Sequence, residues 1–274
     1  MTVHFDLDAY LGRIGYGGPL EATPDVLAAL QSAHVNAIPF EGLDRLMRLP
    51  VKLDIGSLQS KIVAGRRGGN CFELNGLFQA ALERIGFAVR ALGARVRWMS
   101  APDSPMGPRE HMLLLVELAD GPRIVDVGFG ACLIDAPLAF EVGAEQRTPM
   151  GTYRLSLEDG VYFLNAKQPT GWRTAYAFGL ERQYPADFEM ANAFAPLNPR
   201  LPFLSNLVAE RVTADRRYKL INRMFLTEAR DGELVAEQPV ASAEVLGRLL
   251  ETQLGIQSPV PVEDLFRRTP GEGS

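Results

Sequence analysis

The first part of the chain carries apolar residues at the spacing of amphipathic helices. Thr23-Pro24 combines an N-cap residue with a proline suited to the first helical position, and apolar residues follow at helical intervals. A second helix is predicted over residues 57–63. A third, with a broad apolar stripe, is predicted over residues 72–85 and ends at Gly86, which favours helix termination. This segment is therefore predicted to be a bundle of helices.

After the third helix the pattern changes to short runs rich in β-forming residues. These runs lie between residues 87 and 178 and are separated by Gly, Pro and Asp, which is typical of an antiparallel sheet or barrel. Beyond them, helices are predicted over residues 187–194 and 242–255, and strands within residues 205–229. The tail, residues 267–274, is expected to be frayed. Helices, then strands, then mixed elements predict an α+β fold.

The composition is that of a globular protein and excludes several classes of function. The 274 residues are 47% hydrophobic and 22% charged, close to the usual averages. A net charge of −5, with no run of Lys or Arg longer than two, argues against nucleic acid as the main partner. No stretch of about 18 apolar residues predicts a membrane span, and Asp6 and Asp8 stand where a signal peptide needs an apolar core. We therefore expect a cytoplasmic protein without a membrane partner.

The chain contains too few cysteines for a disulfide framework or a zinc site. Cys71 and Cys132 lack the spacing of a Cys-x-x-Cys pair, and no cluster of metal ligands is apparent. We therefore expect no bound metal. The three histidines are His4, His34 and His111, so any mechanism that needs an imidazole must use one of them.

The stretch RRGGNCFELNGLFQAALERIG places Cys71 at the start of the third helix. Asn70 is a good N-cap, and Glu73 stands where the carboxylate of a capping box belongs. The first turn of a helix has backbone N–H groups without partners, and the helix dipole favours negative charge there, so a thiolate is stabilised. The alternative is a small apolar residue at the start of a core helix. Position alone does not decide between these two roles.

A nucleophilic thiol needs a base, and His111 is the best candidate. It opens the apolar strand HMLLLVEL after a polar, proline-rich loop, so its side chain can project into a cleft while the strand stays in a sheet. The alternative is a surface histidine at a strand end. His34 is expected to be packed, and His4 to be solvated.

An imidazole base needs an acceptor that orients it, and Asp126 meets this need. It is flanked by valines in the apolar strand RIVDVGFG, and a buried carboxylate requires a partner. Ala-Asp-Gly at 119–121 is a good hairpin turn, which brings His111 and Asp126 to one end of one sheet. The alternative is an edge-strand aspartate that faces solvent. Together Cys71, His111 and Asp126 predict a papain-like arrangement of thiol, base and orienting group.

Five motifs occur in one order along the first half of the chain. They are AYLGRIGYGG at 9–18, AIPFEGLDRL at 37–46, RRGGNCFELNGLF at 66–78, EHMLLLV at 110–116 and VDVGFG at 125–130. In this combination the chain resembles the arylamine N-acetyltransferase family, although LPFLSNLVAERV in the second half is less distinctive. One departure is Gly42, where many members of the family have asparagine.

The resemblance implies an α+β fold with a papain-like cysteine-transferase architecture. It implies a helical bundle with the nucleophile at 1–86, an antiparallel β-barrel with the histidine and the aspartate at 87–190, and an α/β lid at 191–274. The implied activity is acetyl transfer from acetyl-CoA to the nitrogen of an arylamine, arylhydrazine or related amine through an acetyl-cysteine, in xenobiotic metabolism. Acetyl-CoA is then a co-substrate, no cofactor is bound permanently, and the chain is a monomer or homodimer.

The resemblance also assigns roles to individual residues. The cysteine, the histidine and the aspartate discussed above match the family's catalytic residues. Phe40, Phe129 and Phe203 match positions at which the family lines its acceptor pocket, although each is also suited to an ordinary core.

Two other functions remain open. A thiol hydrolase or amidase would use the same three residues, and only the pocket decides whether water or an amine resolves the acyl-enzyme. A non-catalytic thioester- or CoA-binding module is less consistent with an intact set of thiol, base and acid. Arg66 and Arg67 are candidates for a CoA phosphate contact or for a solvated or ion-paired role, and Cys132 is expected to be an inert small residue.

Overall fold

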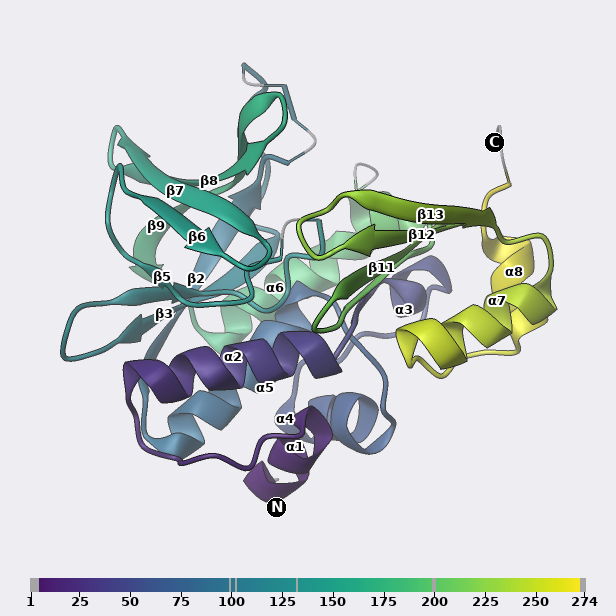
Figure 1. Ribbon diagram of the computed structural model, residues 1–274, viewed down its shortest axis with the longest axis horizontal. Helices are drawn as coiled ribbons and strands as arrows, with labels where there is room; N and C mark the ends of the chain where they lie inside the picture. The colour runs from purple at the N-terminus through teal and green to yellow at the C-terminus, as the bar shows by residue number, and fades with distance from the viewer. Residues whose placement is uncertain (1–4, 99, 102, 132, 199–200, 272–274) are drawn as a thin grey trace.

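Helices from the first third of the chain lie beneath two antiparallel sheets in the computed structural model (Figure 1). The structure describes residues 5–98, 100–101, 103–131, 133–198 and 201–271. The helices are α1 (Leu7–Ile14), α2 (Pro24–Ala37), α3 (Leu43–Leu46), α4 (Ile55–Leu58), which continues into the π-helical turn Gln59–Ala64, and α5 (Cys71–Ile85). The three helices predicted from the sequence are therefore confirmed, whereas α1 and α3 lie outside the predicted segments.

The caps of these helices explain where they begin and end. The Thr23 hydroxyl accepts from a backbone N–H of the first turn of α2, and Pro24 opens that helix. Gly86 ends α5 with a positive φ of 112°, a conformation that glycine adopts without strain. Asp6 and Gly15 cap α1 in the same way. This helix escapes a prediction from periodicity because it is short.

Strands from the middle of the chain form an eight-stranded antiparallel sheet in the order β5-β4-β3-β2-β9-β8-β7-β6. They are β2 (Ala88–Val96), β3 (His111–Glu117), β4 (Arg123–Val125), β5 (Leu138–Ala139), β6 (Glu145–Thr148), β7 (Gly151–Glu158), β8 (Val161–Gln168) and β9 (Gly171–Arg182). The two edges meet where the Gln146 side-chain amide donates to the Ala139 carbonyl at 2.9 Å and accepts from the Ala139 N–H at 2.6 Å. The predicted antiparallel barrel is therefore confirmed as a nearly closed sheet.

The hairpin of β3 and β4 has the turn that the sequence predicts. Its register pairs Val116 with Arg123 across residues 118–122. His111 and Asp126 consequently lie at the same open end of the hairpin. Asp126, however, lies one residue beyond β4, which corrects its predicted place inside the strand.

A second, five-stranded antiparallel sheet takes one strand from the helical segment. Its order is β1-β10-β11-β12-β13, with strands β1 (Phe40–Glu41), β10 (Val208–Val212), β11 (Arg216–Ile221), β12 (Met224–Ala229) and β13 (Leu234–Pro239). The helices α7 (Ala243–Leu249), continued by the π-helical turn Leu250–Leu254, and α8 (Val262–Arg268) share a hydrophobic core with this sheet. The sequence predicts β10 to β12 and α7, but not β13 or α8. Because β1 pairs with β10, backbone hydrogen bonds join the first part of the chain to the last.

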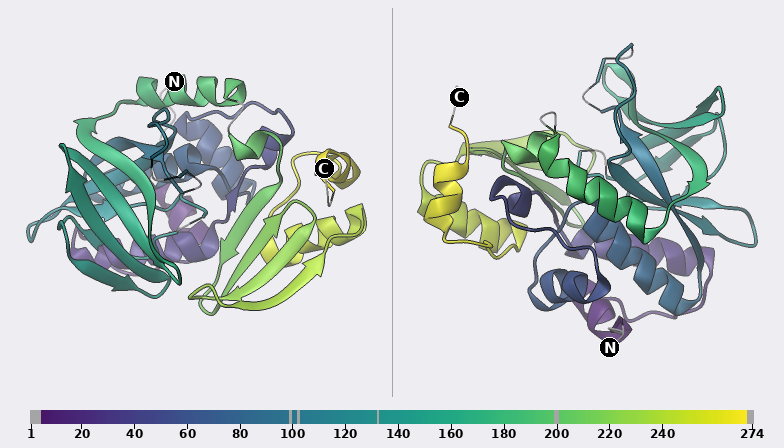
Figure 2. Two further views of the ribbon diagram at one scale, coloured as in Figure 1. Left: turned by 90° about the horizontal axis from the view of Figure 1, so that it is seen from above. Right: turned by 180° about the vertical axis from the view of Figure 1, so that it is seen from behind.

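Helix α6 (Pro185–Phe194) connects the two sheets and crosses the back of the molecule (Figure 2). The 3-10 turns Ala195–Leu197 and Pro202–Leu204 follow it. The division of the chain at residues 86 and 190 into three domains stays a prediction. Among the described residues, no helix combines the length and the apolar character needed to cross a bilayer.

The prediction of a frayed tail is wrong for its first residues. Arg267 and Arg268 belong to α8, and Thr269 is buried with its hydroxyl donating to the Leu265 carbonyl at 2.8 Å. The tertiary packing of α8 therefore overrides a polar local sequence. Residues 272–274 lie outside the described part of the chain.

His34 is buried in the core of the helical segment, as predicted. Its Nδ1 shares a hydrogen bond with the Tyr10 hydroxyl at 2.9 Å, and its ring packs edge-on against Phe78. Burial, followed by the charge of Arg13, lowers the pKa of His34 to about 3. The imidazole is therefore neutral in the folded protein near neutral pH. His4 lies outside the described residues.

This buried imidazole makes the free energy of unfolding depend on pH. Below the ordinary pKa of 6.5, and down to about 3, the unfolded chain binds a proton that the folded chain excludes. We therefore expect His34 to cost about 1.4 kcal/mol of stability for each pH unit in this window. Urea unfolding across the window should show a steeper loss for the wild-type protein than for His34→Gln, and equal slopes would contradict the prediction.

Candidate active site

Cys71 is the first residue of α5 and follows the capping box that the sequence predicts. The Asn70 side chain accepts from the N–H groups of Phe72 and Glu73, and the Glu73 carboxylate accepts from the Asn70 N–H at 3.0 Å. These N–H groups are therefore occupied, which corrects the expectation of unpartnered donors in this turn. The dipole of the 15-residue helix still favours negative charge at Cys71.

The Cys71 thiol faces the start of β3. Its Sγ lies 3.6 Å from the carbonyl oxygen of Glu110, and the sulfur also interacts with the imidazole of His111. Gly128 lets the loop after β4 approach this point, because a Cβ there would lie 2.7 Å from the Cys71 Cα and 2.8 Å from the Asn75 amide nitrogen. The structure therefore brings the predicted thiol and imidazole together.

His111 and Asp126 form a buried pair next to the thiol. The His111 Nε2–H donates to Asp126 Oδ2 at 2.7 Å, and the two side chains are 1% and 0% exposed. Burial by itself lowers the pKa of His111, but the charge and hydrogen bond of Asp126, together with Cys71, raise it to about 10. The imidazole is therefore protonated at neutral pH, and Nδ1 is the ring nitrogen that remains for the thiol.

Asn75 orients the aspartate, and the sequence reasoning missed it. This fully buried residue donates to Asp126 Oδ1 at 3.0 Å and to the Met112 carbonyl at 2.8 Å, and it accepts from the Val127 N–H at 3.0 Å. The Gly128 N–H donates to Asp126 Oδ1 at 2.9 Å. The side chains of Asn75 and Asp126 accept from the backbone N–H groups of residues 127 and 128, so these groups are not used for pairing with a neighbouring strand. Strand β4 therefore ends just before Asp126. A polar residue one helical turn after the cysteine is the signal that could have identified Asn75.

The three phenylalanines predicted to line an acceptor pocket lie in two groups. The Phe129 ring packs edge-on against the His111 imidazole, with ring centroids 5.0 Å apart. Phe40 and Phe203 contact each other, with ring centroids 5.5 Å apart. Gly130 brings the groups together, because a Cβ at this position would lie 2.6 Å from the Phe40 ring. A role of these rings in acceptor binding stays a prediction.

Two further residues shape this region. Tyr176 of β9 packs against His111 with ring centroids 4.9 Å apart, and only the strand order brings it there. Gly42 lies against Phe203, because a Cβ at Gly42 would be 3.1 Å from that ring. An asparagine at position 42 would therefore crowd Phe203.

A buried ionic network supports the N-terminus of α5. Arg67 pairs with Glu41 at 2.7 Å and with Asp44 at 2.8 Å, while Lys61 pairs with Asp44 at 2.7 Å and with Glu73 at 2.6 Å. The guanidinium of Arg67 is thus committed to internal carboxylates. Glu73 links the network to the capping box and so to the cysteine.

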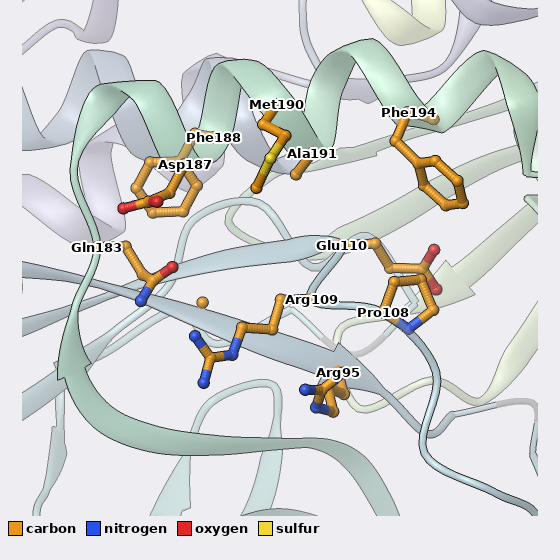
Figure 3. A pocket seen from close by; sticks show the side chains of 12 residues that line it. Arg95, Pro108, Arg109, Glu110, Gln183, Asp187, Phe188, Met190, Ala191 and Phe194 are labelled. Atoms are coloured by element: carbon orange, nitrogen blue, oxygen red, sulfur yellow. The ribbon is translucent and has the colours of Figure 1, made fainter.

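A cavity of about 510 Å³ lies beside this centre, between α6 and the sheet that carries His111 (Figure 3). Phe188, Ala191 and Phe194 form an apolar wall on α6, and Glu110 lines the opposite side. The Glu110 carboxylate accepts from Asn198 Nδ2 at 2.9 Å. Because the cysteine and histidine are not part of its lining, the cavity adjoins the candidate site without containing it. The described residues hold no cluster of metal-ligating side chains, and Cys132 lies outside them.

The fold and the site define a class of protein. A thiol at a helix N-terminus that meets an imidazole–carboxylate pair on neighbouring strands is the geometry of enzymes that carry acyl groups on a cysteine. The side chains come from two separate parts of an α+β fold, so the fold itself assembles the centre.

Comparisons with known proteins narrow this class to one family. Residues 23–260 match the N-acetyltransferase family model. An arylamine N-acetyltransferase of Mycobacterium tuberculosis is 40% identical over 221 residues, which cover 80% of this chain and 78% of that protein. An arylamine N-acetyltransferase / N-hydroxyarylamine O-acetyltransferase of Salmonella typhimurium is 38% identical over 251 residues, which cover 91% of this chain and 88% of that protein. The chain belongs to the arylamine N-acetyltransferase family and is therefore an acyltransferase.

Solved structures of this family share the fold. The arylamine N-acetyltransferase of Salmonella typhimurium superposes with a TM-score of 0.88 at 37% identity, covering 92% of each chain. That of Mycobacterium marinum in complex with CoA superposes with a TM-score of 0.90 at 34% identity, covering 97% of this chain and 100% of that one. The α+β fold predicted from the sequence is therefore confirmed.

Proposed function

We propose that this enzyme transfers an acetyl group from acetyl-CoA to the nitrogen of an arylamine, arylhydrazine or related amine, by way of an acetyl-thioester on Cys71. The observation that carries the proposal is the contact of the Cys71 thiol with an imidazole that a buried carboxylate holds at 2.7 Å. Family membership supports the arylamine acceptor. The CoA complex of the Mycobacterium marinum relative supports the donor.

In the first half-reaction, Cys71 accepts the acetyl group. The raised pKa of His111 favours an imidazolium beside a thiolate, and the thiolate attacks the thioester carbonyl. A bond forms between Sγ and the carbonyl carbon, and the bond to the CoA sulfur breaks. The leaving thiolate takes the proton of His111, so CoA departs as a thiol and the imidazole is left neutral.

In the second half-reaction, the acetyl group passes to the amine. The amine nitrogen attacks the acetyl-cysteine carbonyl, and the neutral imidazole of His111 removes the proton from that nitrogen. The amide leaves, and the enzyme returns to its thiolate–imidazolium pair. Asp126 stabilises the imidazolium and holds Nδ1 toward the sulfur, while Asn75 holds the carboxylate in place.

An amine must react in preference to water for this cycle to be a transfer. An arylamine is a weak base, so it is largely neutral and nucleophilic near pH 7. The ring of Phe129 offers it an apolar surface against the imidazole, and the paired rings of Phe40 and Phe203 lie beyond Gly130. A thiol hydrolase would share the first half-reaction and release acetate to water in the second.

The intact mass of the enzyme after mixing with acetyl-CoA alone tests this proposal. We expect a mass increase of one acetyl group, located on Cys71, that disappears when an arylamine is added and the acetylated amine is formed. Double-reciprocal plots should give parallel lines, because CoA leaves before the amine reacts. Intersecting lines would indicate direct transfer in a ternary complex, and release of acetate without acetylated amine would favour the hydrolase.

A further inference from the structure

The turn that follows β12 reaches from the five-stranded sheet toward the eight-stranded sheet (Figures 1 and 2). Arg230 is the first residue of this turn, and its side chain is 15% exposed. Its guanidinium contacts three separate segments: Nη2 pairs with Asp135 Oδ2 at 3.0 Å, and Nη1 donates to Asn36 Oδ1 at 3.2 Å and to the Thr213 carbonyl. Arg230 therefore joins the five-stranded sheet to α2 and to the segment between β4 and β5.

Asp135 lies in the same inter-strand segment as Phe129, residues 126–137, and its side chain is 1% exposed. Among the described residues, Arg230 is its ion-pair partner, and the other carboxylate oxygen has no hydrogen bond. Breaking a buried pair by removing one partner leaves an uncompensated charge, which is strongly unfavourable. The pair is therefore a firm attachment of this segment to the sheet.

Two sets of anchors hold this segment on either side of Phe129. At its start, Asn75 and Asp126 bind the backbone N–H groups of residues 127 and 128. At its end, the Tyr153 hydroxyl donates to the carbonyl of residue 133 at 2.7 Å, and the Gln31 amide donates to that of residue 134 at 2.8 Å. The ion pair between Asp135 and Arg230 also attaches this end of the segment to the five-stranded sheet.

The rings proposed to hold the acceptor lie on both sides of the contact between the five-stranded sheet and the segment that follows β4. Phe129 belongs to the anchored segment, whereas Phe40 lies in β1 of the five-stranded sheet and packs on Phe203. Among the described residues, Arg230–Asp135 is the ion pair that links the five-stranded sheet and its turns to the eight-stranded sheet and its connections. This pair therefore adds a second attachment between Phe129 and Phe40, beside the close approach of Gly130 to the Phe40 ring.

We infer that Arg230 is a positioning residue for the amine acceptor. Its ion pair with Asp135 holds the segment that carries Phe129 at a fixed position relative to Phe40 and Phe203. The inference rests on the proposed function, because it takes the space between these rings as the acceptor site. It places the effect of Arg230 in the second half-reaction. Acetylation of Cys71 by acetyl-CoA depends on the anchors at the start of the segment, which Arg230 does not touch.

Steady-state and single-turnover kinetics of Arg230→Met in the full-length enzyme test the inference. We expect the KM for an arylamine to rise roughly tenfold, because small displacements of a pocket wall weaken the alignment of a bound substrate. The rate at which acetyl-CoA acetylates Cys71, followed by intact mass, should change less than about twofold. Arg230→Lys should recover much of the amine KM, because an ammonium group can still pair with Asp135.

Arg223→Met is the matched control. Arg223 is a partly buried arginine in the turn between β11 and β12, and its guanidinium donates to the carbonyls of Phe266 and Thr269 at 3.4 Å, in and just after α8. Its loss should lower thermal stability and leave the amine KM unchanged. If Arg230→Met does not fold, Asp135→Asn and Arg230→Lys decide the question.

Two results would overturn the inference while leaving the proposed function intact. One is an unchanged amine KM in a folded Arg230→Met or Asp135→Asn enzyme. The other is a rise in KM of the same size in Arg223→Met, which would show a general effect of destabilisation. Failure of the wild-type enzyme to become acetylated would instead contradict the proposed function.

Discussion

Cys71→Ala should abolish acetyl transfer, with a loss on the order of 10⁴ or more, and should no longer gain an acetyl group from acetyl-CoA. The physical reason is that no other described side chain combines a thiol with the imidazole of His111. The variant should fold normally. The residue lies half-buried at the first position of α5, and Asn70 and Glu73 cap that helix without using the thiol. Circular dichroism and intact mass would check both statements.

The second cysteine of the chain serves as the control for this experiment. Cys132→Ala should retain most of the activity and should still be acetylated at Cys71. An inactive Cys132→Ala enzyme together with an active Cys71→Ala enzyme would reverse the assignment of the nucleophile.

Asp126→Asn should lower turnover by on the order of 10² or more, because the loss of charge changes the state of His111. The carboxylate raises the pKa of His111, so its removal lowers that pKa and reduces the imidazolium fraction at neutral pH. The new amide can also donate to Nε2, which places the ring proton on Nδ1 of the neutral imidazole, facing the sulfur. Both effects disfavour the thiolate–imidazolium pair. The pH profile of Cys71 alkylation by iodoacetamide should therefore move to higher pH.

Asp120→Asn provides a matched control on the same hairpin. Asp120 is exposed in the turn between β3 and β4, where it pairs with Arg123 at 2.5 Å. Its substitution should alter neither turnover nor the alkylation profile. A folded Asp126→Asn enzyme that behaves like Asp120→Asn would exclude Asp126 from the catalytic machinery.

Several features of the candidate site follow from short stretches of sequence. The capping box at Asn70 and Glu73 places the cysteine at a helix start, and the hairpin turn at 119–121 aligns His111 with Asp126. These features depend on residues only a few positions apart, so the local sequence specifies them. Asn75 could have been found by the same reasoning, since it lies one helical turn after Cys71 on α5.

Other features depend on contacts that no local pattern encodes. The pairing of Phe40 with Glu210 makes β1 part of the five-stranded sheet, although a two-residue strand has too little length to be recognised. Tyr176 reaches His111 because β9 lies beside β2, which the order of strands along the chain does not reveal. The place of Asp126 just beyond β4 likewise follows from the bonds that Asn75 makes.

By itself, the sequence determined the main helices and their caps, the β3–β4 hairpin, and the thiol, imidazole and carboxylate of the candidate site. Local backbone preference and hydrophobic periodicity are sufficient for these features. Only the tertiary structure decided which strands are neighbours, and which buried polar groups complete the site. Contacts such as that of Arg230 with Asn36 join residues 194 positions apart. Their free energy depends on burial and charge pairing that exist only once the chain has folded.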